Sequence, residues 1–182
     1  MTIQAEPDVL SLAERIAVEH HDSAPEWARH DPDALAATVA LAAAASLTEM
    51  GRDDGSACYG LGVLFGSDEA IAALNEQWRG KPIPTNVLSW PGDMEGSEVR
   101  AAPDGSVHLG DLAFAVGVVE REAHERDLPL ADHVAVLAVH GVMHCLGLDH
   151  PTTEDARAME GIEARALRRI GVSDPYEGSE PM

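Results

Sequence analysis

The chain has 182 residues and a formal net charge of −20, with 12 basic against 32 acidic side chains. This length suits one folded domain over residues 1–182, with a core large enough to fold alone. The charge argues against a protein that coats nucleic acid through a broad basic surface. It still permits a small positive site formed by a metal and a few arginines.

The sequence also predicts the compartment. No apolar run reaches about 18 residues, and no basic segment followed by an apolar core stands at the N-terminus, so we expect neither a membrane span nor a signal peptide. The two cysteines, Cys58 and Cys145, lie far apart without C-x-x-C spacing and are expected to be reduced thiols. These features predict a cytoplasmic protein with no membrane partner.

The N-terminal part predicts a strand and a helix. Residues 1–9 are mostly polar and are expected to be loose, and apolar residues alternate over 10–18, which predicts a strand. The tract 20–25 is expected to be a turn. An Asp-Pro pair then opens an alanine-rich helix over 31–50, which Gly51 closes.

The middle of the chain predicts two strands around a helix. Alternation predicts a strand over 58–65, and a Ser cap followed by acidic residues predicts a helix over 67–80. A short strand is expected over 86–90. Residues 91–106 are rich in Gly, Pro and acidic residues and are expected to form a mobile loop.

The C-terminal part predicts a last strand and three helices. The strand, over 109–115, is interrupted by a Gly-Asp pair, and helices follow over 116–126, 130–147 and 152–170. The helix over 130–147 is apolar nearly all round and is therefore expected to be central. This order predicts an α/β (α+β) fold, a single mixed sheet of about four strands with helices packed around it.

Three histidines mark the candidate site. His140, His144 and His150 follow H-x3-H-x5-H spacing. Residues four apart lie on one face of a helix, so His140 and His144 point the same way, and Gly147 permits the turn that brings back His150. Three imidazoles with a fourth position open are typical of a catalytic zinc site, which predicts one Zn²⁺ per chain.

The same spacing occurs in the metzincin proteases, whose motif is H-E-x-x-H-x-x-G-x-x-H. Here Gly141 stands where those enzymes carry the glutamate that acts as general base. Peptide hydrolysis is therefore in doubt, although a metallopeptidase of another design stays an alternative. A second alternative is a zinc-containing ribosome assembly factor without catalytic activity.

Three segments in order resemble the YbeY family of bacterial endoribonucleases: residues 75–90, the Leu109-Gly110-Asp111 segment, and the histidine segment from His140 to His150. The resemblance extends over about residues 16–176. It implies a single α/β domain with a three-histidine zinc site that cleaves single-stranded RNA. It also implies a role in 16S rRNA 3′-end maturation and ribosome quality control, with a ribosomal protein or a ribosome-assembly GTPase as partner.

The resemblance assigns roles to particular residues. The three histidines match the metal ligands, and Arg79 matches a functional arginine, whose planar guanidinium suits a phosphate. Lys81 is a candidate RNA contact. Asp111 and Asp149 are candidates for orienting a metal histidine or the turn before it. The sequence departs from the family at Trp90, where Phe is common, and in its acidity, which leaves open how RNA is captured.

Overall fold

The protein is described here from a computed structural model, in which residues 3–53, 55–92, 94–95, 98–99 and 101–175 are described. Its centre is a four-stranded mixed sheet with the strand order β1-β2-β6-β3. The strands are β1 (Ile16–Asp22), β2 (Tyr59–Gly66), β6 (Val107–Ala115) and β3 (Val87–Pro91). β1, β2 and β6 are parallel, and β3 pairs antiparallel to β6 at the edge. The predicted fold class, a mixed sheet of about four strands with helices around it, is confirmed.

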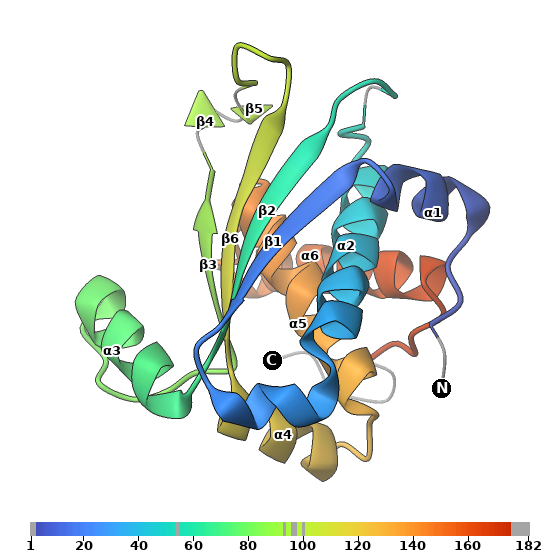
Figure 1. Ribbon diagram of the computed structural model, residues 1–182. Helices are drawn as coiled ribbons and strands as arrows, with labels where there is room; N and C mark the ends of the chain where they lie inside the picture. Colours follow the sequence, from blue (N-terminus) through green and yellow to red (C-terminus); the bar gives the residue numbers. More distant parts are fainter. Residues whose placement is uncertain (1–2, 54, 93, 96–97, 100, 176–182) are drawn as a thin grey trace.

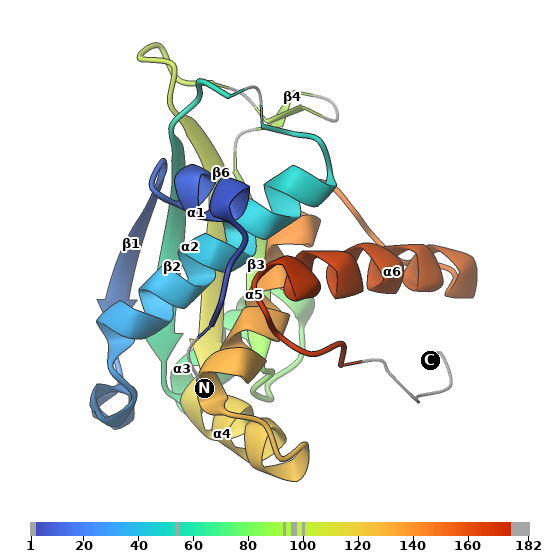
Figure 2. The same ribbon diagram turned by 90° about the vertical axis from the view of Figure 1, so that its right-hand side faces the viewer.

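The helices are distributed unequally over the two faces of the sheet. α2 (Pro32–Glu49) and α5 (Leu130–Cys145) cover one face, with α6 (Thr153–Arg169) packed outside them (Figures 1 and 2). Among the described elements, α3 (Asp68–Arg79) covers one end of the other face, and it stands apart from the other helices in Figure 1. α4 (Val116–Glu125) lies at the lower end of the sheet in the same view. We call the less covered side the open face.

Alternation along the strands sets the two faces. In β2 the large side chains of Tyr59, Leu61, Val63 and Phe65 are buried toward α2 and α5. Gly60, Gly62 and Leu64 therefore face the open side, because successive residues of a strand point to opposite faces. Gly62 has a local reason to lack a side chain, since a Cβ atom there would clash with the Asp111 carboxylate.

α5 is the central helix, as its apolar sequence predicted. Val134, Ala138 and Val139 are completely buried between the sheet and its neighbouring helices. Gly141 brings the helix close to the sheet, because a Cβ atom there would lie 2.7 Å from Leu112 Cδ2. This close packing fixes the position of the histidines that follow on the same helix.

The predictions for the N-terminal segment were partly wrong. Residues Pro7–Ala13 form a helix, α1, and the strand begins only at Ile16 and continues to Asp22, through part of the tract expected to turn. Pro7 opens the helix, and Val9 is fully buried against the core. The Glu6 amide also donates to the Arg169 carbonyl, at 2.8 Å, so this part of the segment expected to be loose is held in place.

Part of the segment 91–106 is paired. Met94–Glu95 (β4) and Glu98–Val99 (β5) form a two-stranded antiparallel sheet, and Ala101 makes a single bridge to Val107. The mobility expected for this segment stays a prediction.

The length and the apolar content of a helix decide whether it could cross a membrane. Within the described ranges, no single helix is both long enough and apolar enough to cross one. Within the same ranges, the pair α4 and α5 is long and apolar enough when its two helices are counted together, but the chain bends by 111° between them.

One ion-pair cluster ties α2 to α6 and gives a pH-dependent prediction. Glu49 accepts from Arg165 at 2.8 Å and from Arg169 at 2.5 Å. Burial alone would raise the pKa of Glu49, but the two arginines outweigh it and lower that pKa. The stabilisation is therefore present above the ordinary carboxyl range and is lost as the pH falls through the lowered pKa.

We expect Glu49→Gln to lower the free energy of unfolding at pH 7 by about 1.5–3 kcal/mol, the range for hydrogen bonds to charged groups. The difference from wild type should shrink as acid protonates the carboxylate. Urea unfolding followed by circular dichroism, repeated at decreasing pH, measures it. A difference that stays constant into the acid range would show that the ion pairs do not stabilise the fold.

Candidate metal-dependent active site

The three histidines lie together at the end of α5. His140 and His144 are one helical turn apart, with their Nε2 atoms 3.1 Å from each other. The ring of His150 lies 5.7 Å from that of His140 and 5.2 Å from that of His144, centroid to centroid. One nitrogen from each ring can be chosen so that all lie within 4.8 Å of one another. The structure therefore brings together the ligand set that the spacing predicted.

The turn after α5 returns the chain to this point. Gly147 has a φ of +89°, in the left-handed region that glycine adopts without strain. Its amide donates to the His144 carbonyl at 3.0 Å, and the Leu148 amide donates to the Met143 carbonyl at 3.0 Å. The Asp149 carboxylate accepts from the His150 amide at 2.9 Å. Asp149 thus lies next to the last histidine and holds its backbone.

Two hydrogen bonds orient the imidazole rings. His140 Nδ1 donates to Glu163 Oε1 at 2.7 Å, and His144 Nδ1 donates to the Leu148 carbonyl at 2.8 Å. With the proton on Nδ1, the Nε2 lone pair of each ring is available to a metal. Burial, together with the neighbouring His140, lowers the pKa of His144 and so favours the neutral form that binds metal.

The spacing of the first two histidine nitrogens fits a zinc ion. Zinc binds histidine nitrogen at about 2.0–2.1 Å in tetrahedral geometry, which separates two ligand nitrogens by about 3.3 Å. The Nε2 atoms of His140 and His144, 3.1 Å apart, are close to that spacing. His140, His144 and His150 would hold the ion.

Glu163 is the contact that sequence reasoning missed. Its side chain is only 3 % exposed, although it carries a carboxylate, and it reaches His140 from α6. The available signal was its position on the apolar stripe of α6, between Met159 and Ile170, where a charged residue needs a partner. A carboxylate that accepts from a metal-binding histidine fixes its tautomer and raises its basicity.

We therefore expect Glu163→Gln to weaken zinc binding by about 10–100-fold, because the amide offers His140 a neutral acceptor instead of a charged one. Competition with a chromophoric chelator measures this affinity. Glu160→Gln is the matched control, since Glu160 lines the same cavity without a described bond to a histidine. Equal zinc affinity in Glu163→Gln and wild type would remove Glu163 from the site.

A cavity of about 410 Å³ opens beside His140 and His150. The remaining lining comes from the start of α6 and the turn before it: Pro151, Thr152, Thr153, Ala156, Met159, Glu160 and Glu163. Its volume is in the range of small-molecule sites. A substrate group therefore has room next to the candidate metal.

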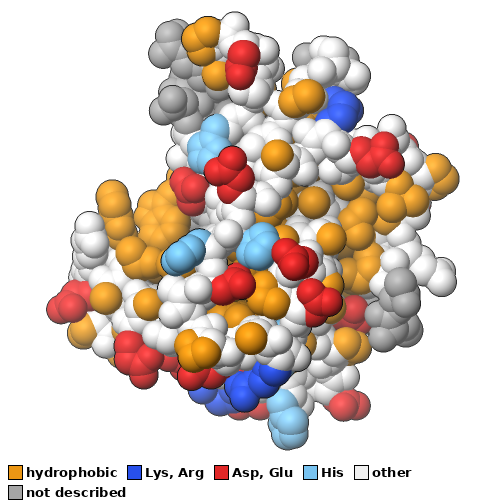
Figure 3. Space-filling model, viewed as in Figure 1, with side chains coloured by type: hydrophobic (Ala, Val, Ile, Leu, Met, Phe, Trp, Pro, Cys, Tyr) orange, Lys and Arg blue, Asp and Glu red, His pale blue; other side chains and the backbone are white. Residues whose placement is uncertain are grey.

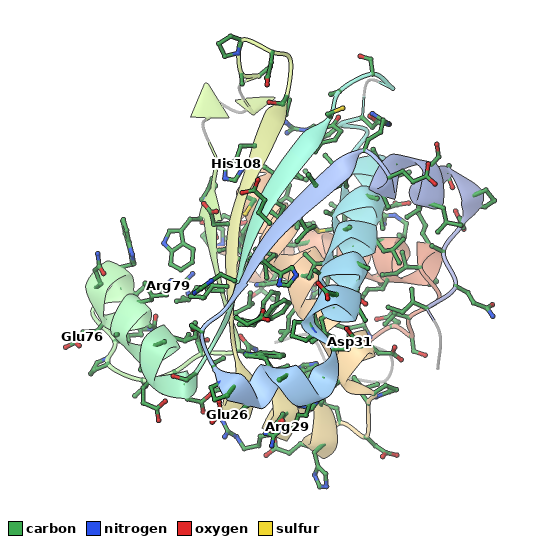
Figure 4. All side chains as sticks on the ribbon, viewed as in Figure 1. Glu26, Arg29, Asp31, Glu76, Arg79 and His108 are labelled. Atoms are coloured by element: carbon green, nitrogen blue, oxygen red, sulfur yellow. The ribbon has the colours of Figure 1, made fainter. Side chains whose placement is uncertain are left out.

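The structure places the other candidate residues away from this cavity. Arg79 is exposed at the end of α3 (Figure 4), Lys81 is exposed two residues later, and neither is among the residues that line the cavity. Asp111 lies on the open face, where its carboxylate is 3.4 Å from His108 Nε2. Strand alternation and the bulge at Gly110 direct this carboxylate to the side of the sheet opposite α5, which carries His140 and His144. Glu163 takes the orienting position considered for Asp111.

The geometry also bears on the peptidase alternative. Gly141 follows His140 on α5, faces Leu112 of the sheet and is buried. A glutamate side chain at this position would have to displace the packed Leu112. The packing of α5 therefore leaves no room at this position for the glutamate that serves as general base in metzincins.

Three imidazoles directed at one point, a carboxylate that orients one of them and an adjoining cavity define a metal-dependent hydrolase. The family model for Endoribonuclease YbeY matches residues 24–171. The chain belongs to this family of hydrolytic nucleases.

Individual relatives agree with the family match. The chain is 45 % identical over 157 residues to Endoribonuclease YbeY of Jannaschia sp. (strain CCS1), covering 84 % of this chain and 95 % of the relative. It is 40 % identical over 174 residues to that of Dinoroseobacter shibae, covering 90 % and 92 %. A solution structure from Thermotoga maritima, 22 % identical, superposes with a TM-score of 0.47 over 91 % of this chain and 97 % of that one.

Proposed function

We propose that the protein is a zinc-dependent endoribonuclease that cleaves single-stranded RNA in 16S rRNA 3′-end maturation and ribosome quality control. The observation that supports the chemistry is the set of three histidines whose ligand nitrogens lie within 4.8 Å of one another. Membership of a nuclease family supports RNA as the substrate. The rRNA role rests on what that family resemblance implies.

The residues around the cavity have distinct tasks. When bound there, zinc supplies Lewis acidity and a water that ionises near neutral pH. Glu163 keeps His140 in the tautomer that leaves Nε2 free. The turn at Gly147 and Asp149 positions His150. The cavity beside the histidines gives part of the RNA room next to the metal.

In this proposal Arg79 stabilises the negative charge of the phosphate once RNA is bound, a role that rests on its match to the functional arginine of the family. Its guanidinium is exposed, and the described residues give it no hydrogen bond or ion pair. A planar guanidinium binds two phosphate oxygens at once. Lys81, two residues on, is also exposed and adds positive charge to the same segment.

The acidity of the chain supports a partner in RNA capture. Four arginines are held in ion pairs with acidic side chains: Arg15, Arg29, Arg165 and Arg169. Acidic side chains outnumber basic ones by 32 to 12, so the surface as a whole should repel RNA and affinity for naked RNA should be low. We propose that a ribosomal protein or a ribosome-assembly GTPase delivers the RNA, and that the protein acts in the cytoplasm, where ribosomes are assembled.

The proposed activity is tested with matched substrates. A 5′-labelled RNA oligonucleotide is incubated with zinc-loaded protein either alone or annealed to its complement, in parallel with an unstructured peptide. Internal cleavage of the single strand, with the duplex and the peptide spared, is the expected result. Cleavage of the peptide, or no cleavage of any RNA, would contradict the proposal.

A further inference from the structure

The open face of the sheet carries a second cavity, of about 510 Å³, larger than the one beside the histidines. It lies between α3 and strands β2, β6 and β3, and its lining comprises Gly62, Val63, Leu64, Leu74, Trp78, Trp90, Asp111, Leu112 and Ala113. Figure 3 shows this face, with hydrophobic side chains gathered next to α3. Nothing in the metal chemistry uses this cavity.

Two tryptophans form one side of the cavity. Trp78, on the last turn of α3, is 62 % exposed, and Trp90, on β3, is half-buried. Their rings meet edge to face, with centroids 6.3 Å apart. Ile71 and Leu74 suffice to pack α3 on the sheet, so Trp78 extends beyond the core that holds its helix. An exposed indole of this kind offers a flat surface for stacking.

The floor of the cavity carries one charged group, the Asp111 carboxylate, among apolar side chains and backbone. Gly62 has no side chain, which makes room for this carboxylate above β2. Asp111 is exposed and has one described side-chain partner, His108, at 3.4 Å. A carboxylate accepts hydrogen bonds from amino groups, as it does from the N4 amino group of cytosine. It also repels phosphate, so the cavity itself suits a base and not the sugar–phosphate backbone.

Positive charge stands at the edge of this cavity. Arg79 follows Trp78 directly and Lys81 comes two residues later, both exposed and both without a described ion pair. Figure 4 places Arg79 between α3 and the sheet. A backbone phosphate next to a base in the cavity can therefore meet a cationic side chain on this segment. Aromatic faces beside basic residues are typical of single-strand binding.

We propose that this cavity binds one unpaired nucleobase of a single-stranded RNA, separate from the metal centre. The base stacks on Trp78 and Trp90, and its exocyclic amino group donates to Asp111. The inference rests on the proposed function for the nature of the ligand. Cytosine, adenine and guanine carry such an amino group and uracil does not, so the cavity selects against uracil.

The position of β3 connects this cavity to the histidines. Cys145, the residue after His144, donates from Sγ to the Trp90 carbonyl at 3.5 Å, while the Trp90 ring faces the open side. β3 is an edge strand, so a chain that crosses its edge passes from one site to the other. A base held by the tryptophans thereby anchors the RNA beside the cleavage site and sets which phosphate reaches the histidines.

The experiment measures binding without cleavage. Dye-labelled hexamers of cytidine, adenosine or uridine are titrated with full-length protein in chelator, and binding is followed by anisotropy. The cytidine and adenosine hexamers should bind more tightly than uridine and should quench tryptophan fluorescence. Trp27, the third tryptophan, is completely buried and cannot stack on a ligand.

Three variants make the test specific. Trp78→Ala should reduce affinity for the cytidine hexamer by about fivefold or more, the effect of losing one stacked base. Leu10→Ala, at an exposed apolar residue on α1, is the matched control and should bind as wild type does. Asp111→Asn should narrow the preference for cytidine over uridine, because an amide both donates and accepts.

The outcomes separate the possibilities. Equal affinity of Trp78→Ala and wild type would overturn the proposal. So would a change of oligomeric state in Trp78→Ala, seen by sedimentation without a change in RNA affinity, since the face would then be an interface between copies of the chain. Binding is measured without metal, so it can be judged separately from cleavage. If binding depends on Trp78 but the protein never cleaves RNA, only the proposed nuclease activity is rejected. If the protein cleaves RNA but its binding does not depend on Trp78, only the base-binding cavity is rejected.

Discussion

Replacing His144 by alanine is expected to abolish stoichiometric zinc binding and, with it, RNA cleavage. Wild type should hold about one zinc per chain, as three protein ligands with an open position imply. The ring of His144 lies 4.5 Å from that of His140 and 5.2 Å from that of His150, centroid to centroid, and its Nε2 atom is 3.1 Å from that of His140. Two remaining histidines, one of them on an exposed turn, should bind the ion only weakly. Elemental analysis of the purified variant measures the loss.

The control for this variant is another histidine of the same chain. His124 is exposed on α4 and is not part of the cluster, so His124→Ala should keep its zinc. Zinc retained near one per chain by His144→Ala would show that the three histidines do not form the site. The stability of both variants is compared without metal, so that unfolding is not mistaken for loss of a ligand.

Arg79→Ala is expected to fold and keep its zinc yet lose most of its cleavage rate. Removing a charge-assisted contact to the phosphate should cost about 2–4 kcal/mol of transition-state stabilisation, or about 30- to 1,000-fold in rate. Arg79→Lys should restore only part of it, because an ammonium group lacks the two-pronged geometry of guanidinium. Single-turnover cleavage of a single-stranded RNA measures the rate.

Arg168→Ala provides a charge-matched comparison. Arg168 is exposed on α6, and the described residues give it no side-chain ion pair, so its removal changes the net charge without removing a phosphate contact. Its cleavage rate should stay close to that of wild type. If Arg79→Ala cleaves as fast as Arg168→Ala, Arg79 has no role in the reaction.

The metal ligands could be predicted because their geometry is local. His140, His144 and His150 fall within one helical turn and the loop after it, so spacing and one glycine determine where they meet. Glu163 could not be predicted in the same way. It reaches His140 from another helix, 23 residues on, and that contact depends on how α5 and α6 pack.

Two other differences have similar causes. Over 10–18 the apolar residues alternate like a strand, but Val9 and Leu12, three apart, are the pair that α1 buries, and Leu10 stays exposed. The proline at the start of that helix outweighs the apparent alternation. Asp111 was considered for the metal site, but the bulge at Gly110 and the pleat of β6 direct it to the open face. The face of the sheet to which a strand residue points depends on the pairing and the bulges of the whole sheet.

Cleavage of single-stranded RNA by one preparation, assayed together with its zinc content before chelation, after chelation and after zinc is added back, tests the metal-dependent nuclease most directly. Cleavage should fall with the zinc content and return when zinc is restored, while His144→Ala should stay inactive throughout. Full cleavage by wild-type protein from which the metal has been removed would contradict a metal-dependent active site at His140, His144 and His150.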